Sequence, residues 1–226
     1  MLPAVETRDT VQRVWVLAWL NVVLHGLGLI VAWFGLRPGS VVAPLAERMA
    51  YLAADPAIWR WGWGIWMLCA VVLVAYMAVL ERLLPLRSTA ARLALVLTAA
   101  GMAVDLLCDG LQIGVLPLAA ANGPSAAPLF LALERLAFVG GATVANGLYT
   151  TGVLLMTLRM GTLAGTPARL AGWGTVAAGY AMMAAGLLPS PALLQATAGP
   201  TLVFYCLWTV LLAHALRRQD RDEPMR

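Results

Sequence analysis

Long runs of predominantly apolar residues follow one another along almost the whole of this chain. A run of about 20 apolar residues is long enough to cross the hydrocarbon core of a bilayer as a helix. Of the 226 residues, 62% are hydrophobic and only 12% are charged, and that charged share is about half of what soluble domains carry. The runs therefore predict an all-α, polytopic membrane helix bundle that forms a single domain over residues 1–226.

Residues that begin or end helices divide the runs into six predicted transmembrane helices. Pro85 and Pro117 are expected to end the second and third helices, and Ser88 or Thr89 to cap the start of the third. Pro189 and Pro191 are expected to close the fifth helix, and Pro200 suits the first turn of the sixth. The predicted spans are 13–36, 57–84, 90–117, 128–159, 168–188 and 197–217.

The connection between the first two spans, residues 38–56, is the longest between predicted helices. Within it, the stretch from Pro44 to Ala54 is short and weakly amphipathic. Amphipathic helices of this kind lie in the interface plane of a membrane. We therefore predict a surface segment here, which lies on the bilayer.

Arginine distribution predicts how the bundle is oriented. The chain contains no lysine, and its formal net charge is +4. Most arginines fall on the side that carries both predicted termini, whereas Arg37, Arg48 and Arg60 fall on the other side and Arg135 falls inside the membrane. The positive-inside rule then places both termini in the cytoplasm and the protein in the cytoplasmic (inner) membrane. Because the arginines flank apolar runs, we expect a lipid bilayer as partner and no nucleic acid.

Five ionisable residues interrupt the apolar runs: His25, Asp105, Asp109, Glu134 and Arg135. A charge near the centre of a membrane helix opposes insertion by about 2.5–3.5 kcal/mol. Ionisable residues in such positions are rare, and they mark pathways, proton relays and binding sites. They therefore define the candidate site.

Helical spacing places most of these residues on three faces. Asp105 and Asp109 share a face of the third span, with Gln112 further along it, and Gly101 would let another helix approach. Other polar side chains fall on one face of the first span and close to one stripe of the fourth: Asn21 and His25, and Arg135, Asn146 and Tyr149. We predict that these residues line a polar cavity between the first, third and fourth helices, open at the outer face and reaching about the membrane centre.

Two arrangements of the charges are compatible with the sequence. In the first, Arg135 pairs with Asp109, and Glu134 or Gln112 completes a neutral network without further chemistry. That pairing leaves surplus carboxyl groups, so we expect at least one of them to hold a proton near neutral pH. In the second arrangement, Asp105 and His25 therefore form a deeper pair that transfers protons.

Aromatic residues and metal-ligand types complete the candidate set. Trp59, Trp63 and Trp66 form a stripe on the second span, which either anchors the helix at the interface or provides an aromatic wall for a lipophilic or cationic ligand. The three cysteines have no CxxC spacing, and no His or Glu pair has a spacing typical of metal sites. We therefore expect neither a metal nor another cofactor.

Three classes of function remain open. The first is binding or transport of a small solute, with proton coupling through Asp105 and His25. The second is an intramembrane enzyme with isomerase- or cyclase-type acid–base chemistry on a lipophilic substrate. The third is a non-catalytic membrane subunit or sensor. The sequence does not decide among them, and it leaves oligomeric assembly open.

Overall fold

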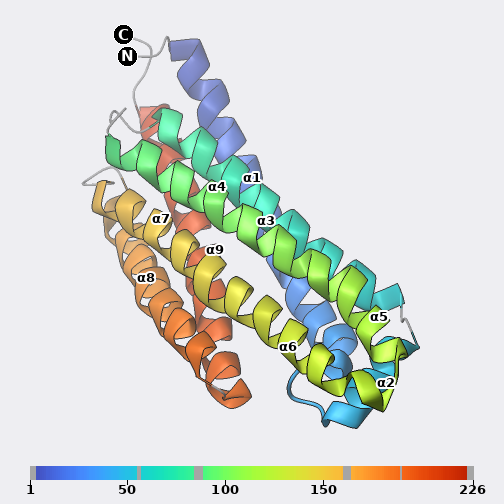
Figure 1. The fold of residues 1–226 in the computed structure, drawn as a ribbon. Coiled ribbons are helices and arrows are strands. Elements are labelled where there is room, and N and C mark those ends of the chain that lie inside the picture. The colour runs from blue at the N-terminus through green and yellow to red at the C-terminus, as the bar shows by residue number, and fades with distance from the viewer. Residues whose placement is uncertain (1–3, 55–56, 84–88, 160–163, 189, 223–226) are drawn as a thin grey trace.

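The protein is an all-helical bundle in which six helices are long and apolar enough to cross a membrane (Figure 1). The computed structural model describes residues 4–54, 57–83, 89–159, 164–188 and 190–222, and within these ranges every regular element is a helix. The predicted fold class and the six spans are confirmed. The chain is thus a multi-pass membrane protein.

Several of the spans are built from more than one helical segment. The first consists of α1 (Ala4–Val31) and the π-helix η1 (Ala32–Leu36), and the second is α3 (Ala57–Leu83). The third consists of α4 (Thr89–Gly110), the π-helix η3 (Leu111–Val115) and α5 (Leu116–Ala121). The fourth consists of α6 (Ala127–Phe138), the π-helix η5 (Val139–Ala145) and α7 (Asn146–Arg159). The fifth is α8 (Gly165–Leu187), and the sixth is α9 (Pro191–Asp222). The connections contain η2 (Arg37–Gly39), α2 (Leu45–Ala53) and η4 (Pro124–Ala126).

Proline positions explain where the predicted boundaries differ from the structure. Pro117 lies in the first turn of α5, so the third span continues to Ala121 instead of ending. Pro191 begins α9 rather than following α8, and Pro200 lies inside α9. A proline is tolerated in a first helical turn because its missing N–H would have no partner there. The predicted helix end at residue 84, Pro85, Ser88 and Pro189 lie outside the described residues.

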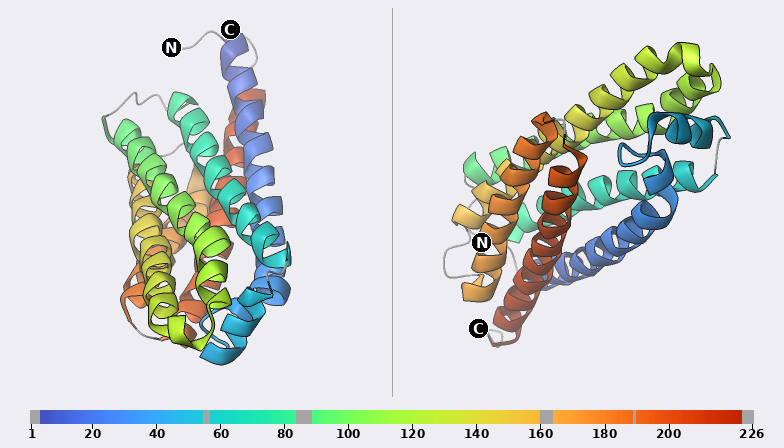
Figure 2. Two further views of the ribbon diagram at one scale, coloured as in Figure 1. Left: turned by 45° about the vertical axis from the view of Figure 1, so that its right-hand side comes forward. Right: turned by 90° about the horizontal axis from the view of Figure 1, so that it is seen from below.

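The six spans form a closed ring in chain order (Figure 2). Each span packs against the next, and α9 packs against α1 to close the ring. The start of α1 and the end of α9 lie at one end of the bundle, which we call the termini end, and α2 lies at the other, the α2 end (Figure 1). Since α1 packs mainly on α3 and α9, the first span does not lie directly against the third and fourth, and the predicted cavity between these three spans stays a prediction. Their polar side chains can meet only across the interior of the ring.

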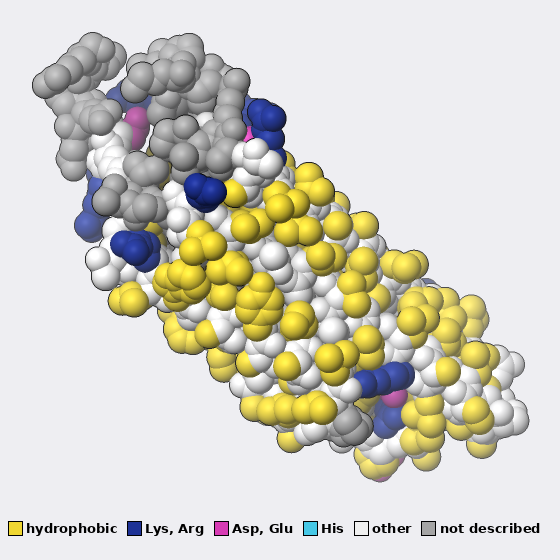
Figure 3. All heavy atoms as spheres, turned by 60° about the vertical axis from the view of Figure 1, so that its left-hand side comes forward, with side chains coloured by type: hydrophobic (Ala, Val, Ile, Leu, Met, Phe, Trp, Pro, Cys, Tyr) yellow, Lys and Arg dark blue, Asp and Glu magenta, His cyan; other side chains and the backbone are white. Residues whose placement is uncertain are grey.

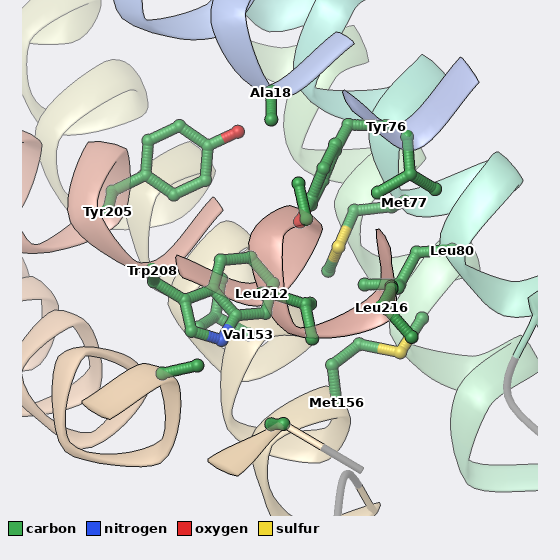
Figure 4. Close-up of a cluster of buried hydrophobic side chains, with 14 of the residues drawn as sticks. Ala18, Tyr76, Met77, Leu80, Val153, Met156, Tyr205, Trp208, Leu212 and Leu216 are labelled. Carbon is green, nitrogen blue, oxygen red and sulfur yellow. The ribbon is translucent and has the colours of Figure 1, made fainter. Parts of the chain in front are cut away.

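A dry apolar core fills the half of the ring nearer the termini end (Figure 4). Tyr76, Trp208, Met156 and Leu212 are fully buried in it, and they come from α3, α9 and α7. The Tyr76 hydroxyl donates to the carbonyl of Thr209 at 3.1 Å within this core. This half of the bundle is therefore closed by side chains.

The α2 end has its own, smaller core. The predicted segment does form a helix, α2, but Met49 and Leu52 are buried against α3, α5 and α6 together with Trp59 and Phe130. This helix is therefore docked on the bundle by one face, and its position at the bilayer surface stays a prediction. The Tyr51 hydroxyl also donates to the carbonyl of Gly35 at 2.6 Å, which ties α2 to the end of the first span.

The surface of the bundle suits a lipid environment. Large apolar side chains such as Val23, Leu107 and Leu170 are exposed on the spans. In Figure 3 the middle of the molecule is covered with hydrophobic side chains, and basic side chains gather near the termini end at the upper left. Exposed apolar surface on this scale is unfavourable in water. A bilayer around the middle of the bundle accounts for it.

Candidate functional site

Asp105 and Asp109 lie one helical turn apart on α4, on the face that packs against the other spans. The Asp109 side chain is only 3% exposed, and its Oδ2 atom has no hydrogen-bond partner among the described residues. Asp105 is half-buried although it lies on the packed face. A buried carboxyl oxygen without a partner is costly, so this position requires a physical explanation.

Tyr149 on α7 is the hydrogen-bond partner of Asp105. Its hydroxyl donates to Asp105 Oδ2 at 3.1 Å. The two helices approach closely because Gly101 has no side chain: a Cβ atom there would lie 2.9 Å from the Tyr149 ring and 3.0 Å from the carbonyl oxygen of Ala145. Gly101 thus positions Tyr149 against the carboxyl.

The π-helix η5 brings backbone next to the same carboxyl groups. A Cβ atom on Gly140 would collide with the sulfur of Cys108, and one on Gly141 would lie 3.6 Å from Asp105 Oδ1. π-helical segments are rare and occur frequently at functional sites. Apolar periodicity does not indicate this segment, and the glycine pair opposite two aspartates was the signal that could have indicated a close approach.

His25 lies in an aromatic environment and does not bond to Asp105. Its Nδ1 atom is 2.8 Å from the carbonyl oxygen of Asn21, so Nδ1 carries the hydrogen. Its ring packs against Trp66 and Tyr205, with centroid distances of 6.0 Å and 5.3 Å. Within the described residues no hydrogen bond or ion pair joins His25 to Asp105. A direct proton-sharing contact between these two residues is therefore not what the structure contains.

Tyr205 on α9 lies against Asn21 and His25 and was missed from the sequence. Its hydroxyl donates to Asn21 Oδ1 at 3.0 Å, and it lies within electrostatic range of Tyr149. A tyrosine in an apolar run gives no signal by itself, because it is common in helix cores. Its role became visible only when α9 closed the ring against α1.

Side chains from five spans thus lie at a similar level. His25, Asp105 and Tyr205 each lie about 16 residues, or about 24 Å, from the termini end of their spans at 1.5 Å per residue. We call the set that surrounds the interior at this level the polar ring: Asn21, His25, Trp66, Asp105, Asp109, Tyr149 and Tyr205. It lies where the dry core ends.

Glu134 does not belong to the polar ring, because it forms an ion pair with Arg48 of α2. Arg48 Nη2 lies 2.9 Å from Glu134 Oε2, and each side chain is 10% exposed. Arg48 also donates to the carbonyl of Ala43 at 2.8 Å and lies over the Phe130 ring. Arg48 lies at the α2 end, on the side opposite the termini, but its guanidinium is buried, which the sequence did not indicate. The pair holds α2 against α6.

Arg135 does not pair with Asp109, so the predicted neutral network is wrong. Its Nη2 atom donates to the carbonyl oxygen of Leu187, at the C-terminus of α8, at 2.9 Å, and its guanidinium lies over the Phe138 ring. Carbonyls at a helix C-terminus have no intrahelical partner and attract cations. Consecutive residues on a helix point in directions about 100° apart, so Arg135 cannot follow Glu134 into the interior. No basic side chain within the described residues bonds to Asp105 or Asp109.

Three further predicted site residues lie outside the polar ring. Asn146 donates to the carbonyl of Gly179 on α8 at 2.8 Å. Gln112 contributes its backbone carbonyl, which accepts a bond from Trp59 Nε1 at 2.7 Å, and Trp63 packs edge-on against Trp59. The predicted stripe on the fourth span does not exist, because the wider turn of η5 changes the register between Arg135 and Asn146. Of the predicted tryptophans, only Trp66 reaches the ring.

The structure contains a surface hollow at the start of α3, lined by Ala57, Arg60, Trp61 and Gly64. It includes no residue of the polar ring, so the predicted cavity that opens toward Asp105 stays a prediction. In the described part of the chain, no three His, Cys, Asp or Glu side chains lie close enough together to hold a metal ion.

The chain matches no family model, no curated protein and no solved structure in the comparisons. The chemistry of the polar ring must therefore be inferred from its own side chains.

Proposed function

We propose that this multi-pass membrane protein binds or moves a small solute at the polar ring, and that solute binding is coupled to a proton held by Asp105 and Asp109. The observation that supports the proposal is the buried Asp109 carboxyl, which is 3% exposed and has an unpartnered Oδ2. A membrane protein keeps such a group at a cost, and intramembrane carboxyls of this kind are typical of ion and proton sites.

A proton between the two carboxyls lowers the cost of burying them. Two ionised carboxylates one turn apart repel each other, and within the described residues no arginine bonds to either. A proton on one removes the repulsion and supplies a hydrogen-bond donor. A solute that satisfies the same oxygen atoms would compete with that proton. This competition is the physical basis for coupling.

The architecture around the polar ring supports binding from the α2 end. Toward the termini end the apolar core closes the interior, whereas the π-helices η1, η3 and η5 lie at or beyond the level of the ring on the side of α2. π-helical segments interrupt the regular α-helical repeat and occur frequently at functional sites. The core at the α2 end is the smaller of the two, so the proposal places access at that end.

Dicyclohexylcarbodiimide, which modifies protonated carboxyls in apolar surroundings, tests the proposal. We expect it to label Asp105 or Asp109 in lipid nanodiscs at neutral pH, as detected by peptide mass spectrometry, and to label less as the pH rises. Asp220, which pairs with Arg8 near the end of α9, is the internal control and should remain unlabelled. Labelling absent from both aspartates of α4 at every pH would contradict the proposal.

A lipophilic substrate is the second candidate, because three aromatic rings pack together at the level of the carboxyls. His25, Trp66 and Tyr205 form a group that would suit an apolar or cationic intermediate. An intramembrane enzyme of this class would retain a lipid-like molecule on purification. Native mass spectrometry distinguishes the two functions: a bound lipid that is lost in Trp66→Ala would favour the enzyme.

A further inference from the structure

The polar ring has an excess of negative over positive groups. No basic side chain within the described residues bonds to its two carboxyls, and the other ionisable side chains around this level are uncharged in their ordinary forms at neutral pH or, for His25, bonded to a backbone carbonyl. These side chains are Cys69 on α3, Cys108 on α4, Tyr149 on α7, Tyr205 and Cys206 on α9, and His25 on α1. Glu134 on α6 is neutralised by Arg48. A ligand with a positive charge would therefore complete the ring electrostatically.

The unpartnered atom also specifies what kind of cation fits. Asp109 Oδ2 is a buried acceptor that lacks a donor, so a cation with an N–H group would satisfy it with a charge-assisted hydrogen bond. A quaternary ammonium ion has no N–H and would leave this oxygen unsatisfied. The donor requirement favours a protonated amine.

Aromatic faces give the site a second contact for such a cation. His25 and Trp66 pack edge to face, and Tyr205 lies next to His25. Cys69, which is one turn from Trp66 on α3, lies within electrostatic range of both carboxyls. Aromatic rings attract ammonium groups and the apolar groups that such amines carry.

We infer that the solute of the polar ring is a small protonated amine with an apolar or aromatic substituent, which donates to Asp109 and displaces the proton that the carboxyl pair holds. One ammonium ion enters and one proton leaves, so the charge of the site is unchanged. This inference rests on the proposed function, because it requires the carboxyl pair to exchange a proton.

Calorimetric titration of the protein in nanodiscs with three compounds of similar shape tests the inference. Benzylammonium carries the charge and the N–H donors, benzyl alcohol is neutral and benzoate is an anion. After subtraction of empty nanodiscs, we expect benzylammonium alone to bind, and its binding heat to change with the ionisation enthalpy of the buffer because a proton is released. Benzyltrimethylammonium, which lacks an N–H donor, should bind about tenfold to a hundredfold more weakly.

Variants locate the site of binding. Asp109→Asn should weaken benzylammonium binding by about tenfold to a hundredfold, Asp109→Glu should retain part of it, and Asp220→Asn should not change it. Benzyl alcohol binding as tightly as benzylammonium, absence of benzylammonium binding to the wild-type protein, or unchanged binding in Asp109→Asn would each overturn the inference. Carbodiimide labelling of the aspartates without benzylammonium binding would refute the choice of solute and leave the proton site standing.

Discussion

At the scale of single residues, Gly101 controls the contact between Tyr149 and Asp105. We expect Gly101→Ala to push Tyr149 away and destabilise the protein by about 1–3 kcal/mol, because the new Cβ would lie 2.9 Å from the Tyr149 ring. Gly110→Ala on the same helix is the matched control, since a Cβ there meets no atom within 4 Å. Thermal unfolding in detergent compares the two variants, and equal melting temperatures would contradict the close approach.

The ion pair between Arg48 and Glu134 gives a second prediction for individual residues. Glu134→Gln should destabilise the protein by about 3–5 kcal/mol because Arg48 would remain buried without a counter-charge. Glu47→Gln, which alters an exposed carboxyl of α2, is the control and should have little effect. Combining Glu134→Gln with Arg48→Met should recover much of the loss. If the two changes were additive in denaturant unfolding, the residues would not be coupled.

Sequence spacing could predict neighbours on one helix but not partners between helices. The four-residue spacing correctly placed Asp105 and Asp109 on a common face, because the α-helical period holds throughout α4. The partners of Glu134 and Arg135 and the aromatic neighbours of His25 depended on how separate helices pack, and all three residues were expected to have other partners. The acidic surplus was visible from the sequence, whereas the tyrosines that surround it were not.

At the scale of elements, α2 is a docked part of the fold and not a free surface helix. Leu52→Ala should destabilise the protein by about 2–5 kcal/mol, because Leu52 is fully buried in the core of the α2 end. Glu47→Ala on the exposed side of α2 should change stability far less. Hydrogen exchange of the α2 amides would show the difference: we expect faster exchange in Leu52→Ala only, and equal exchange in both variants would mean that α2 is not docked.

The π-helices explain why element boundaries were predicted well and side-chain directions less well. Apolar length and prolines determine where a span lies, and they gave six spans close to those observed. A π-turn inserts an extra residue into the helical repeat, so after η5 the side chains of α7 point in directions that a regular repeat does not predict. The placement of Asn146 against α8 follows from that shift.

At the scale of the whole molecule, the closed ring divides the protein into a sealed half and a half that carries charge. The dry core near the termini end and the polar ring are produced by the same packing of consecutive spans. The sequence predicted a bundle but could not predict that α9 returns to α1, which is what brings Tyr205 to the site. Which end faces the cytoplasm stays a prediction from the arginine distribution.

The most direct test of a proton held by the aspartates of α4 is infrared difference spectroscopy of the protein in nanodiscs during a pH titration. We expect the C=O stretch of a protonated carboxyl in the wild-type spectrum at neutral pH, its loss or shift in both Asp105→Asn and Asp109→Asn, and no change in Asp220→Asn. A wild-type spectrum without any protonated carboxyl at neutral pH, or one that is unchanged in both α4 variants, would show that the carboxyl pair holds no proton.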